Sequence, residues 1–125
     1  MKFPYLQYKE LRLPMVPVQI KGKEWHIVYM FVDSGATYSI MTYKEAARLG
    51  VDPEKGKDQL VRVGDGGLIS LNYQKLLVKI GTTQFKATIG FSKELGVGFN
   101  IMGRKDFFEK FTVCFNDKKG IVQFS

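Results

Sequence analysis

The amino-acid sequence predicts a mostly β fold of one domain, with one clear helix and a second, shorter one. Three observations support this. Short runs of strand-forming residues are separated by turn signals, which recur about every 8–12 residues. The chain has 125 residues, which is the length of a single domain. Hydrophobic residues make up 45% and charged residues 25% of the chain, as in globular proteins and unlike disordered ones.

The first part of the chain predicts a β-hairpin that follows an irregular start. Residues 1–14 are expected to be irregular or edge-like, because their prolines cannot donate a hydrogen bond to a sheet. Residues 16–21 and 25–32 then read as two strands that turn at residues 22–23. The second strand is apolar and ends in Asp33-Ser34-Gly35-Ala36, a polar stop that contains glycine.

A helix is predicted at about residues 42–49. Thr42 is a good N-cap, and Glu45, three residues later, completes the pattern of a capping box. Gly50 supplies the stop signal at the other end. Residues 52–58 are polar and are expected to form a loop.

The middle of the chain predicts four strands. Residues 59–63 and 68–73 look like two strands joined by Gly64-Asp65-Gly66-Gly67. An Asp-Gly pair between strand residues is a strong hairpin signal, because the favoured turns need positive φ. Residues 75–80 and 84–91 are expected to form the next pair.

The last third of the chain predicts short elements. Residues 92–98 read as a glycine-rich loop, and residues 99–102 as a short apolar strand. Residues 104–110 are expected to form a short helix with two phenylalanines. Residues 111–115 and 121–124 then close the chain as two strands around a polar turn.

The rarer residues exclude several classes of site. With one cysteine, Cys114, the chain cannot form an internal disulfide. One cysteine and one histidine cannot make a Cys/His zinc site within a single chain, and nucleotide-binding glycine motifs are missing. We therefore expect no metal and no cofactor. Cys114 is interpreted as a small buried hydrophobe and His26 as a surface or half-buried strand residue, not as a catalytic base.

The charge of the chain is basic but scattered. Nineteen basic residues stand against 12 acidic ones, which gives a net charge of +7. Proteins that read nucleic-acid grooves cluster their basic residues and use arginine, so a solvated basic surface is the preferred interpretation. Nucleic acid is accordingly not an expected partner.

A membrane-spanning segment is not expected either. The longest apolar run, residues 27–32, has six residues, whereas a membrane helix needs about 20. The start of the chain lacks the features of a signal peptide. A cytoplasmic location is therefore the default expectation.

Two segments together carry the functional signal. In Phe31-Val32-Asp33-Ser34-Gly35-Ala36-Thr37 a carboxylate follows directly on an apolar strand, which is costly unless that carboxylate has a use or a partner. An Asx turn that ends the strand explains this stretch equally well. The later segment Phe99-Asn100-Ile101-Met102-Gly103-Arg104 changes the balance. With both segments in this order, residues 16–124 resemble the retroviral-type (retropepsin-like) aspartic proteases.

The resemblance implies a closed β-barrel of the retropepsin or acid-protease type with one or two short helices. It also implies roles for the first motif. Asp33 is the catalytic residue, and the Ser34 hydroxyl hydrogen-bonds across a two-fold axis. Gly35 permits close backbone approach, and Ala36 is small enough not to crowd the cleft. Residues Ile101, Met102 and Gly103 would pack under the Asp33 loop as support.

The hairpin at residues 60–71 would be the flap of such a protease. Its tip residues, Gly64, Asp65, Gly66 and Gly67, would contact the backbone of the substrate and move as a lid. An ordinary surface hairpin is the alternative interpretation. Arg104 follows the glycine as in several retroviral members, where it pairs with an acid. Thr37 stands at the acid's position here, so Asp106 or Glu109 is a possible partner for Arg104 instead.

One Asp-Ser-Gly motif per chain implies a homodimer. The remaining aspartates, at 52, 58, 65, 106 and 117, lie in expected loops, turns or helix. Two Asp33 carboxylates about 3 Å apart repel by roughly 5 kcal/mol at an effective dielectric near 20, so the pair keeps one proton. The charged member activates water and the protonated member polarises the scissile carbonyl.

In the family the chain ends pair into an interface sheet. Residues 120–125 could do this, whereas the first 14 residues show no obvious strand.

Two other functions remain open at this point. A catalytically silent domain of the same fold could bind peptides or proteins. A small β-barrel could bind an anionic partner through its lysine-rich surface, but the two motifs would then be coincidental. The preferred prediction is an aspartic endopeptidase over residues 1–125, with a peptide or protein substrate.

Overall fold

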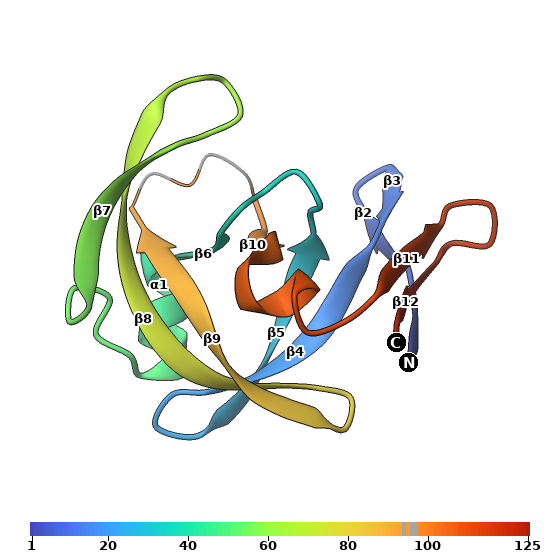
Figure 1. Cartoon of the computed structure of the whole chain (residues 1–125), viewed down its shortest axis with the longest axis horizontal. Helices are drawn as coiled ribbons and strands as arrows, with labels where there is room; N and C mark the ends of the chain where they lie inside the picture. The colour runs from blue at the N-terminus through green and yellow to red at the C-terminus, as the bar shows by residue number, and fades with distance from the viewer. Residues whose placement is uncertain (94, 96–97) are drawn as a thin grey trace.

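The computed structural model describes residues 1–93, 95 and 98–125, and it is mostly β, as the sequence predicts (Figure 1). A seven-stranded sheet has the order β4-β5-β10-β6-β9-β8-β7. A further pairing between β4 and β8 returns this sheet on itself, so that six strands form a ring and β7 lies outside it. The strands are β4 (Met15–Lys21), β5 (Trp25–Val32), β6 (Ser39–Thr42), β7 (Lys57–Arg62), β8 (Leu68–Ile80), β9 (Thr83–Ser92) and β10 (Asn100–Met102).

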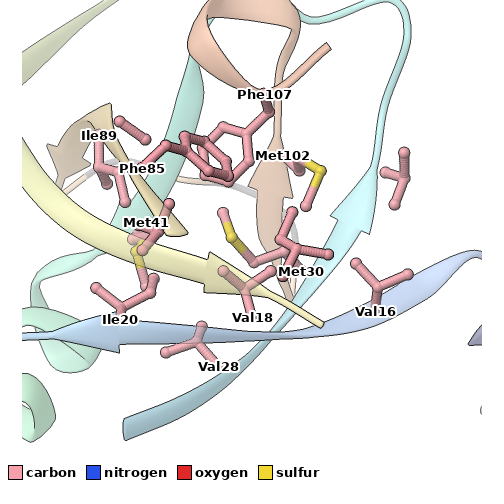
Figure 2. Packing of buried hydrophobic residues seen from close by; sticks show 14 of the residues in the cluster. Val16, Val18, Ile20, Val28, Met30, Met41, Phe85, Ile89, Met102 and Phe107 are labelled. Carbon is pink, nitrogen blue, oxygen red and sulfur yellow. The ribbon is translucent and has the colours of Figure 1, made fainter. Parts of the chain in front are cut away.

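The interior of the ring is the hydrophobic core (Figure 2). Side chains from opposite walls meet there, and Phe107 covers one side against Phe85, with ring centroids 5.5 Å apart. Apolar burial of this kind is the main favourable contribution to folding. The labelled core residues are Val16, Val18, Ile20, Val28, Met30, Met41, Phe85, Ile89, Met102 and Phe107.

Residues 1–14 were expected to be irregular or edge-like, and only the irregular part of this prediction is wrong. They form three short strands, β1 (Lys2–Pro4), β2 (Leu6–Tyr8) and β3 (Leu11–Leu13), of which β1 is an edge strand as expected. β2 and β3 pair with each other, whereas β1 pairs with the C-terminal strand β12 (Ile121–Phe124). Three residues are too few to show a sequence period, and the partner of β1 lies at the other end of the chain.

The two chain ends lie side by side (Figure 1). A second sheet has the order β1-β12-β11, where β11 is Val113–Asn116. The amino group of Met1 donates to the carbonyl oxygen of Phe124 at 2.7 Å, and the Phe124 amide donates to the Met1 carbonyl oxygen at 2.8 Å. Cys114 on β11 is exposed, so its interpretation as a buried residue is wrong.

The helix α1 (Tyr43–Leu49) confirms the prediction for residues 42–49. The Glu45 amide donates to the Thr42 hydroxyl oxygen at 3.1 Å, and Gly50 ends the helix with a left-handed φ of 72°. The Glu45 side chain does not complete the capping box. It forms an ion pair with Arg48, with the nitrogen and oxygen atoms 3.0 Å apart.

The short helix predicted at residues 104–110 is confirmed only in part. It is a shorter helical segment, η1 (Arg104–Phe108), interrupted by a kink where Lys105 has ψ 128° and Asp106 has φ 66°. Long-range bonds hold the backbone in this shape. The Lys105 amide donates to the Thr37 carbonyl oxygen at 2.8 Å, and the Asp106 carboxylate accepts from the Thr88 amide at 2.7 Å.

Two further differences concern strands. The strands predicted at 68–73 and 75–80 are one strand, β8, which runs from the hairpin tip into the barrel. The strand β6 was not expected from the sequence, and it pairs with both β9 and β10. Of the glycine-rich loop predicted at 92–98, residues 94, 96 and 97 lie outside the described residues. No helix within the described ranges has the length and apolar character to span a membrane.

Candidate functional site

Asp33 directly follows β5, at the point where this strand leaves the core. The Asp33 amide donates to the Met102 carbonyl oxygen at 3.0 Å. The chain then turns, and the Ala36 amide donates to the Asp33 carbonyl oxygen at 3.2 Å. The Gly35 amide donates to Oδ1 of Asp33 at 2.9 Å, and the side chain is half-buried. One carboxylate oxygen is thus held by the backbone.

The segment Ile101-Met102-Gly103 lies against this loop. β10 runs parallel to β5, with Met102 beside Val32, and it also pairs with β6 at Ile40. Met102 is fully buried. These contacts explain why the sequence combines apolar residues at 101 and 102 with the aspartate at the end of β5.

Gly103 is required by close packing. A Cβ atom at this position would lie 2.3 Å from the Tyr38 carbonyl oxygen, far inside van der Waals contact. The Gly103 amide donates to the buried hydroxyl of Ser39 at 2.9 Å. The next amide, of Arg104, donates to the Ala36 carbonyl oxygen at 2.8 Å. The Asp33 loop is therefore bonded along its length to residues 102–105.

Arg104 does not form the expected ion pair with Asp106 or Glu109. Among the described residues, the one ion pair within 4.0 Å joins Arg48 and Glu45. Asp106 instead accepts hydrogen bonds from Thr88. Burial raises the pKa of Asp106, but the Thr88 bonds and the nearby Lys105 and Lys75 outweigh burial, so its pKa lies below the ordinary value. Asp106 is thus a charged structural residue.

Two hollows meet at Asp33. One, of about 480 Å³, lies between the loop residues 35–38, the barrel residues Ile40 and Ile101, and residues 61–64, where β7 ends and the hairpin turn begins. The other, of about 550 Å³, lies between residues 31–34, β3 and Phe115. The Asp33 carboxylate therefore stands between two spaces that could each receive a side chain.

The hairpin that the sequence suggests as a flap reaches this site. The end of β7 shares the smaller hollow with Asp33, and the hairpin projects beyond the barrel (Figure 1). At the tip, the Gly67 amide donates to Oδ1 of Asp65 at 2.7 Å, and Gly66 has φ 86°. The Arg62 guanidinium donates to the Gly66 carbonyl oxygen at 2.7 Å. The tip is an ordered turn that is bonded to itself.

Ser34, Ala36 and Thr37 complete the loop. Ser34 is exposed and lines the larger hollow, while Ala36 and Thr37 line the smaller one. Across the described residues, no hydrogen bond involves the Ser34 side chain. The Ser34 hydroxyl therefore has no hydrogen-bond partner in the part of the chain that the structure describes.

Tyr38 and Tyr73 were missed by the sequence analysis. Their rings lie 5.0 Å apart, and Tyr38 lines the smaller hollow. The pKa of Tyr73 is raised to about 12, mainly by burial and to a smaller extent by the neighbouring Tyr38. The Tyr73 hydroxyl is buried and finds no hydrogen-bond partner among the described residues. The signal for Tyr38 was an aromatic residue directly after the aspartate motif.

No metal-binding cluster of three or more His, Cys, Asp or Glu side chains occurs within the described ranges. The site residues predicted from the sequence supply a carboxylate, a hydroxyl group and small side chains. Such a set supports acid–base chemistry on water or a carbonyl group.

Comparison with known proteins agrees with this fold. Residues 16–104 match the family model described as "gag-polyprotein putative aspartyl protease". A retropepsin-like aspartic protease from Rickettsia conorii has a similar crystal structure, with a TM-score of 0.71 and 17% identity over 98% of this chain and 97% of that chain. The protease of EIAV, complexed with the inhibitor HBY-793, gives a TM-score of 0.61 and 20% identity over 84% and 93% of the two chains. Curated proteins gave no match. The fold is thus the retropepsin fold, as the sequence resemblance implied.

Proposed function

Because this chain belongs to the gag-polyprotein putative aspartyl protease family, we propose that it is an aspartic endopeptidase whose active site forms between two copies of the chain. The observation that carries the proposal is the position of Asp33. Its carboxylate is half-buried at the meeting point of two hollows, one of which is bordered by the β7–β8 hairpin. The protease domain proposed here comprises residues 1–125.

The homodimer follows from the chemistry. Activation of water between two carboxylates needs two aspartates, and this chain has one Asp-Ser-Gly sequence. In a two-fold dimer each copy supplies one Asp33, and the pair shares a proton because two adjacent negative charges repel each other. The Ser34 hydroxyl, which lacks a hydrogen-bond partner among the described residues, would bond to the loop of the second copy.

The reaction is then hydrolysis of a peptide bond. The charged carboxylate takes a proton from water, whose oxygen attacks the scissile carbonyl carbon. The protonated carboxyl group donates a hydrogen bond to the carbonyl oxygen. Collapse of the tetrahedral intermediate breaks the C–N bond, and the amine leaves with a proton from the pair. One water is consumed, the products are an acid and an amine, and no metal or cofactor takes part.

An extended peptide is the substrate that fits. Alternate side chains of an extended chain point to opposite sides, and hollows lie on both sides of Asp33. Apolar side chains of Ile40, Val61 and Ile101 line the smaller hollow, so the peptide would present an apolar residue there. The hairpin tip, residues 64–67, is the proposed flap. A cytoplasmic location forms part of the same proposal.

A peptide library and one substitution test the proposal. Asp33→Asn removes both ionisable groups of the dimer at once and keeps an oxygen that can accept the Gly35 hydrogen bond. We expect cleavage, read by mass spectrometry, to fall by several orders of magnitude, beyond the roughly 10²–10⁴ of one acid–base role. Wild-type activity should show a bell-shaped pH profile with an acidic optimum.

The same experiment distinguishes the peptidase from the alternative of a catalytically silent domain. A silent domain would bind peptides of the library without cleaving them, and Asp33→Asn would leave that binding unchanged. Cleavage that persists in a folded Asp33→Asn variant would show that Asp33 is a structural turn residue, and the proposed function would then be rejected.

A further inference from the structure

We propose that a second copy of this chain docks along the open edge of β11, so that one continuous sheet crosses the two-fold axis and the chain ends are not exchanged. The inference rests on the proposed function in one respect, namely that a shared Asp33 site needs two copies. It deepens that function by assigning the interface. The β1-β12-β11 sheet has two outer edges, one on β1 and one on β11.

The C-terminal strand β12 has no edge left for a partner. It pairs with β1 on one side and with β11 on the other, both antiparallel and both within the same chain. Residues 121–123 are paired on both sides in this way. The expectation that residues 120–125 could pair with another copy would require β1 or β11 to be displaced first.

The outer edge of β1 is closed by a proline. Met1 and Phe124 exchange both of their backbone hydrogen bonds, so they are a hydrogen-bonded pair of the antiparallel ladder. Such pairs alternate along a ladder, so Phe3 also faces β12, whereas Lys2 and Pro4 direct their backbone groups outward. Pro4 has no N–H group. Proline at an edge is a common way to prevent pairing with another strand.

The outer edge of β11 is open. Thr112 and Ser125 exchange both backbone hydrogen bonds, each at 3.0 Å. By the same alternation, Cys114 faces β12, whereas Val113 and Phe115 direct their N–H and C=O groups away from it. Within the described residues β12 is the one strand that pairs with β11. This edge therefore offers two donors and two acceptors.

The open edge adjoins the candidate active site. Phe115 is 41% exposed and lines the larger hollow together with Asp33 and Ser34. Arg12 and Asp117 line the same hollow with opposite charges, and in the described part of the chain neither forms an ion pair within 4.0 Å. A two-fold contact is self-complementary, because each surface meets its own copy. It can therefore set Arg12 of one copy against Asp117 of the other.

Antiparallel pairing of β11 with a second β11 is compatible with a two-fold axis. The result is a six-stranded sheet in the order β1-β12-β11-β11-β12-β1, in which each copy keeps its own termini. This arrangement satisfies the edge groups of Val113 and Phe115 and brings the hollow beside Ser34 against the second copy.

Proline substitutions at the two outer edges test the interface. Phe115→Pro removes an outward N–H group and leaves the β11–β12 ladder intact, whereas Lys2→Pro does the same on β1. We expect Phe115→Pro to raise the dimer dissociation constant, measured by analytical ultracentrifugation, about 10- to 100-fold for two lost hydrogen bonds per dimer. Lys2→Pro should change it less than about threefold. Phe115→Ala separates the loss of the ring from the loss of the N–H group.

Two results would overturn the proposal. One is a folded Phe115→Pro variant, checked by circular dichroism, that dimerises like the wild type. The other is that Lys2→Pro abolishes the dimer whereas Phe115→Pro retains it. That result would indicate that the two copies exchange their N-terminal strands. If Phe115→Pro does not fold, hydrogen exchange of the backbone amides in the wild-type chain tests the interface instead. The Val113 and Phe115 amides should exchange slowly above the dissociation constant and fast below it, and equal exchange would count against the interface.

The readouts separate this inference from the proposed function. A dimer that depends on Phe115 but does not cleave peptides supports the interface and rejects the peptidase. Cleavage that depends on Asp33 but is unaffected by Phe115→Pro rejects the interface and leaves the peptidase in place.

Discussion

The Asp33 amide donates a hydrogen bond to the Met102 carbonyl oxygen at 3.0 Å, and this bond joins the end of β5 to the end of β10. These two strands run parallel and come from opposite halves of the chain. The bond holds the aspartate at the point where the barrel opens into its two hollows. The position of the carboxylate therefore depends on residues 101–103 as much as on its own motif.

Gly103→Ala should destabilise the protein by about 1–3 kcal/mol, as overpacking does in well-packed interiors. The added Cβ would meet the Tyr38 carbonyl oxygen at 2.3 Å, and backbone cannot rotate away as a side chain can. Urea unfolding measures the effect. Gly64→Ala is the matched control, because a Cβ there meets nothing within 4 Å and Gly64 lacks a positive φ. Equal stability of the two variants would contradict the close packing.

Mixing wild-type and Asp33→Asn chains should reveal a shared active site. When nine parts of the variant are exchanged with one part of wild type, random pairing leaves about one tenth of wild-type chains in fully wild-type dimers. Peptidase activity per wild-type chain should therefore fall about tenfold. Specific activity of the wild type alone should rise with protein concentration near the dissociation constant. Full activity in a monomer identified by ultracentrifugation would refute the shared pair of carboxylates.

Asp65→Ala should weaken peptide binding by the flap, while Asp65→Asn should preserve it. Oδ1 of Asp65 accepts the Gly67 amide at 2.7 Å, and asparagine keeps this acceptor whereas alanine removes it. The loosened tip must then be ordered when the substrate binds, so KM should rise several-fold with a smaller change in kcat. Steady-state kinetics on one peptide would measure both variants. An equal rise in KM for both would point to the charge of Asp65 instead of the turn.

Tyr73→Phe should leave stability unchanged or raise it by up to about 1 kcal/mol, because it removes a buried hydroxyl that lacks a partner among the described residues. The pKa of Tyr73 is raised from 10.0 to about 12, chiefly because burial disfavours the ionised form, so ionisation of Tyr73 opposes folding. Wild-type stability should therefore fall as the pH rises from 10 to 12, and it should fall less steeply in the variant. Thermal unfolding across this pH range measures the slope.

Tyr5→Phe is the matched comparison for Tyr73→Phe. The pKa of Tyr5 is also raised to about 12, first by burial and then by Asp117. The Tyr5 hydroxyl, however, donates to the Asp117 carboxylate at 2.5 Å. Its removal should cost about 1–3 kcal/mol at neutral pH, because the acceptor is charged. A loss of stability in Tyr73→Phe as large as in Tyr5→Phe would mean that the Tyr73 hydroxyl does have a partner.

Local signals determined the parts of this structure that depend on neighbouring residues. The α1 helix follows from Thr42 and Gly50, whose cap bonds reach three or four residues along the chain. The β7–β8 hairpin follows from its glycine-rich turn. The family resemblance needed two short motifs. They can be recognised in the sequence because a carboxylate at the end of an apolar strand and a glycine under close packing are unusual features.

Tertiary contacts decided the rest, because the partners are distant in sequence. Residues 1–14 look irregular by themselves, and β1 forms because β12 supplies its hydrogen-bond partners from the other chain end. The segment Arg104–Phe108 has the composition of a helix, but it is kinked, because Thr37 and Thr88 form hydrogen bonds with its backbone and with its Asp106 carboxylate. A sequence pattern describes local preference only, and hydrogen bonds from outside the segment outweigh preferences of a few tenths of a kcal/mol per residue.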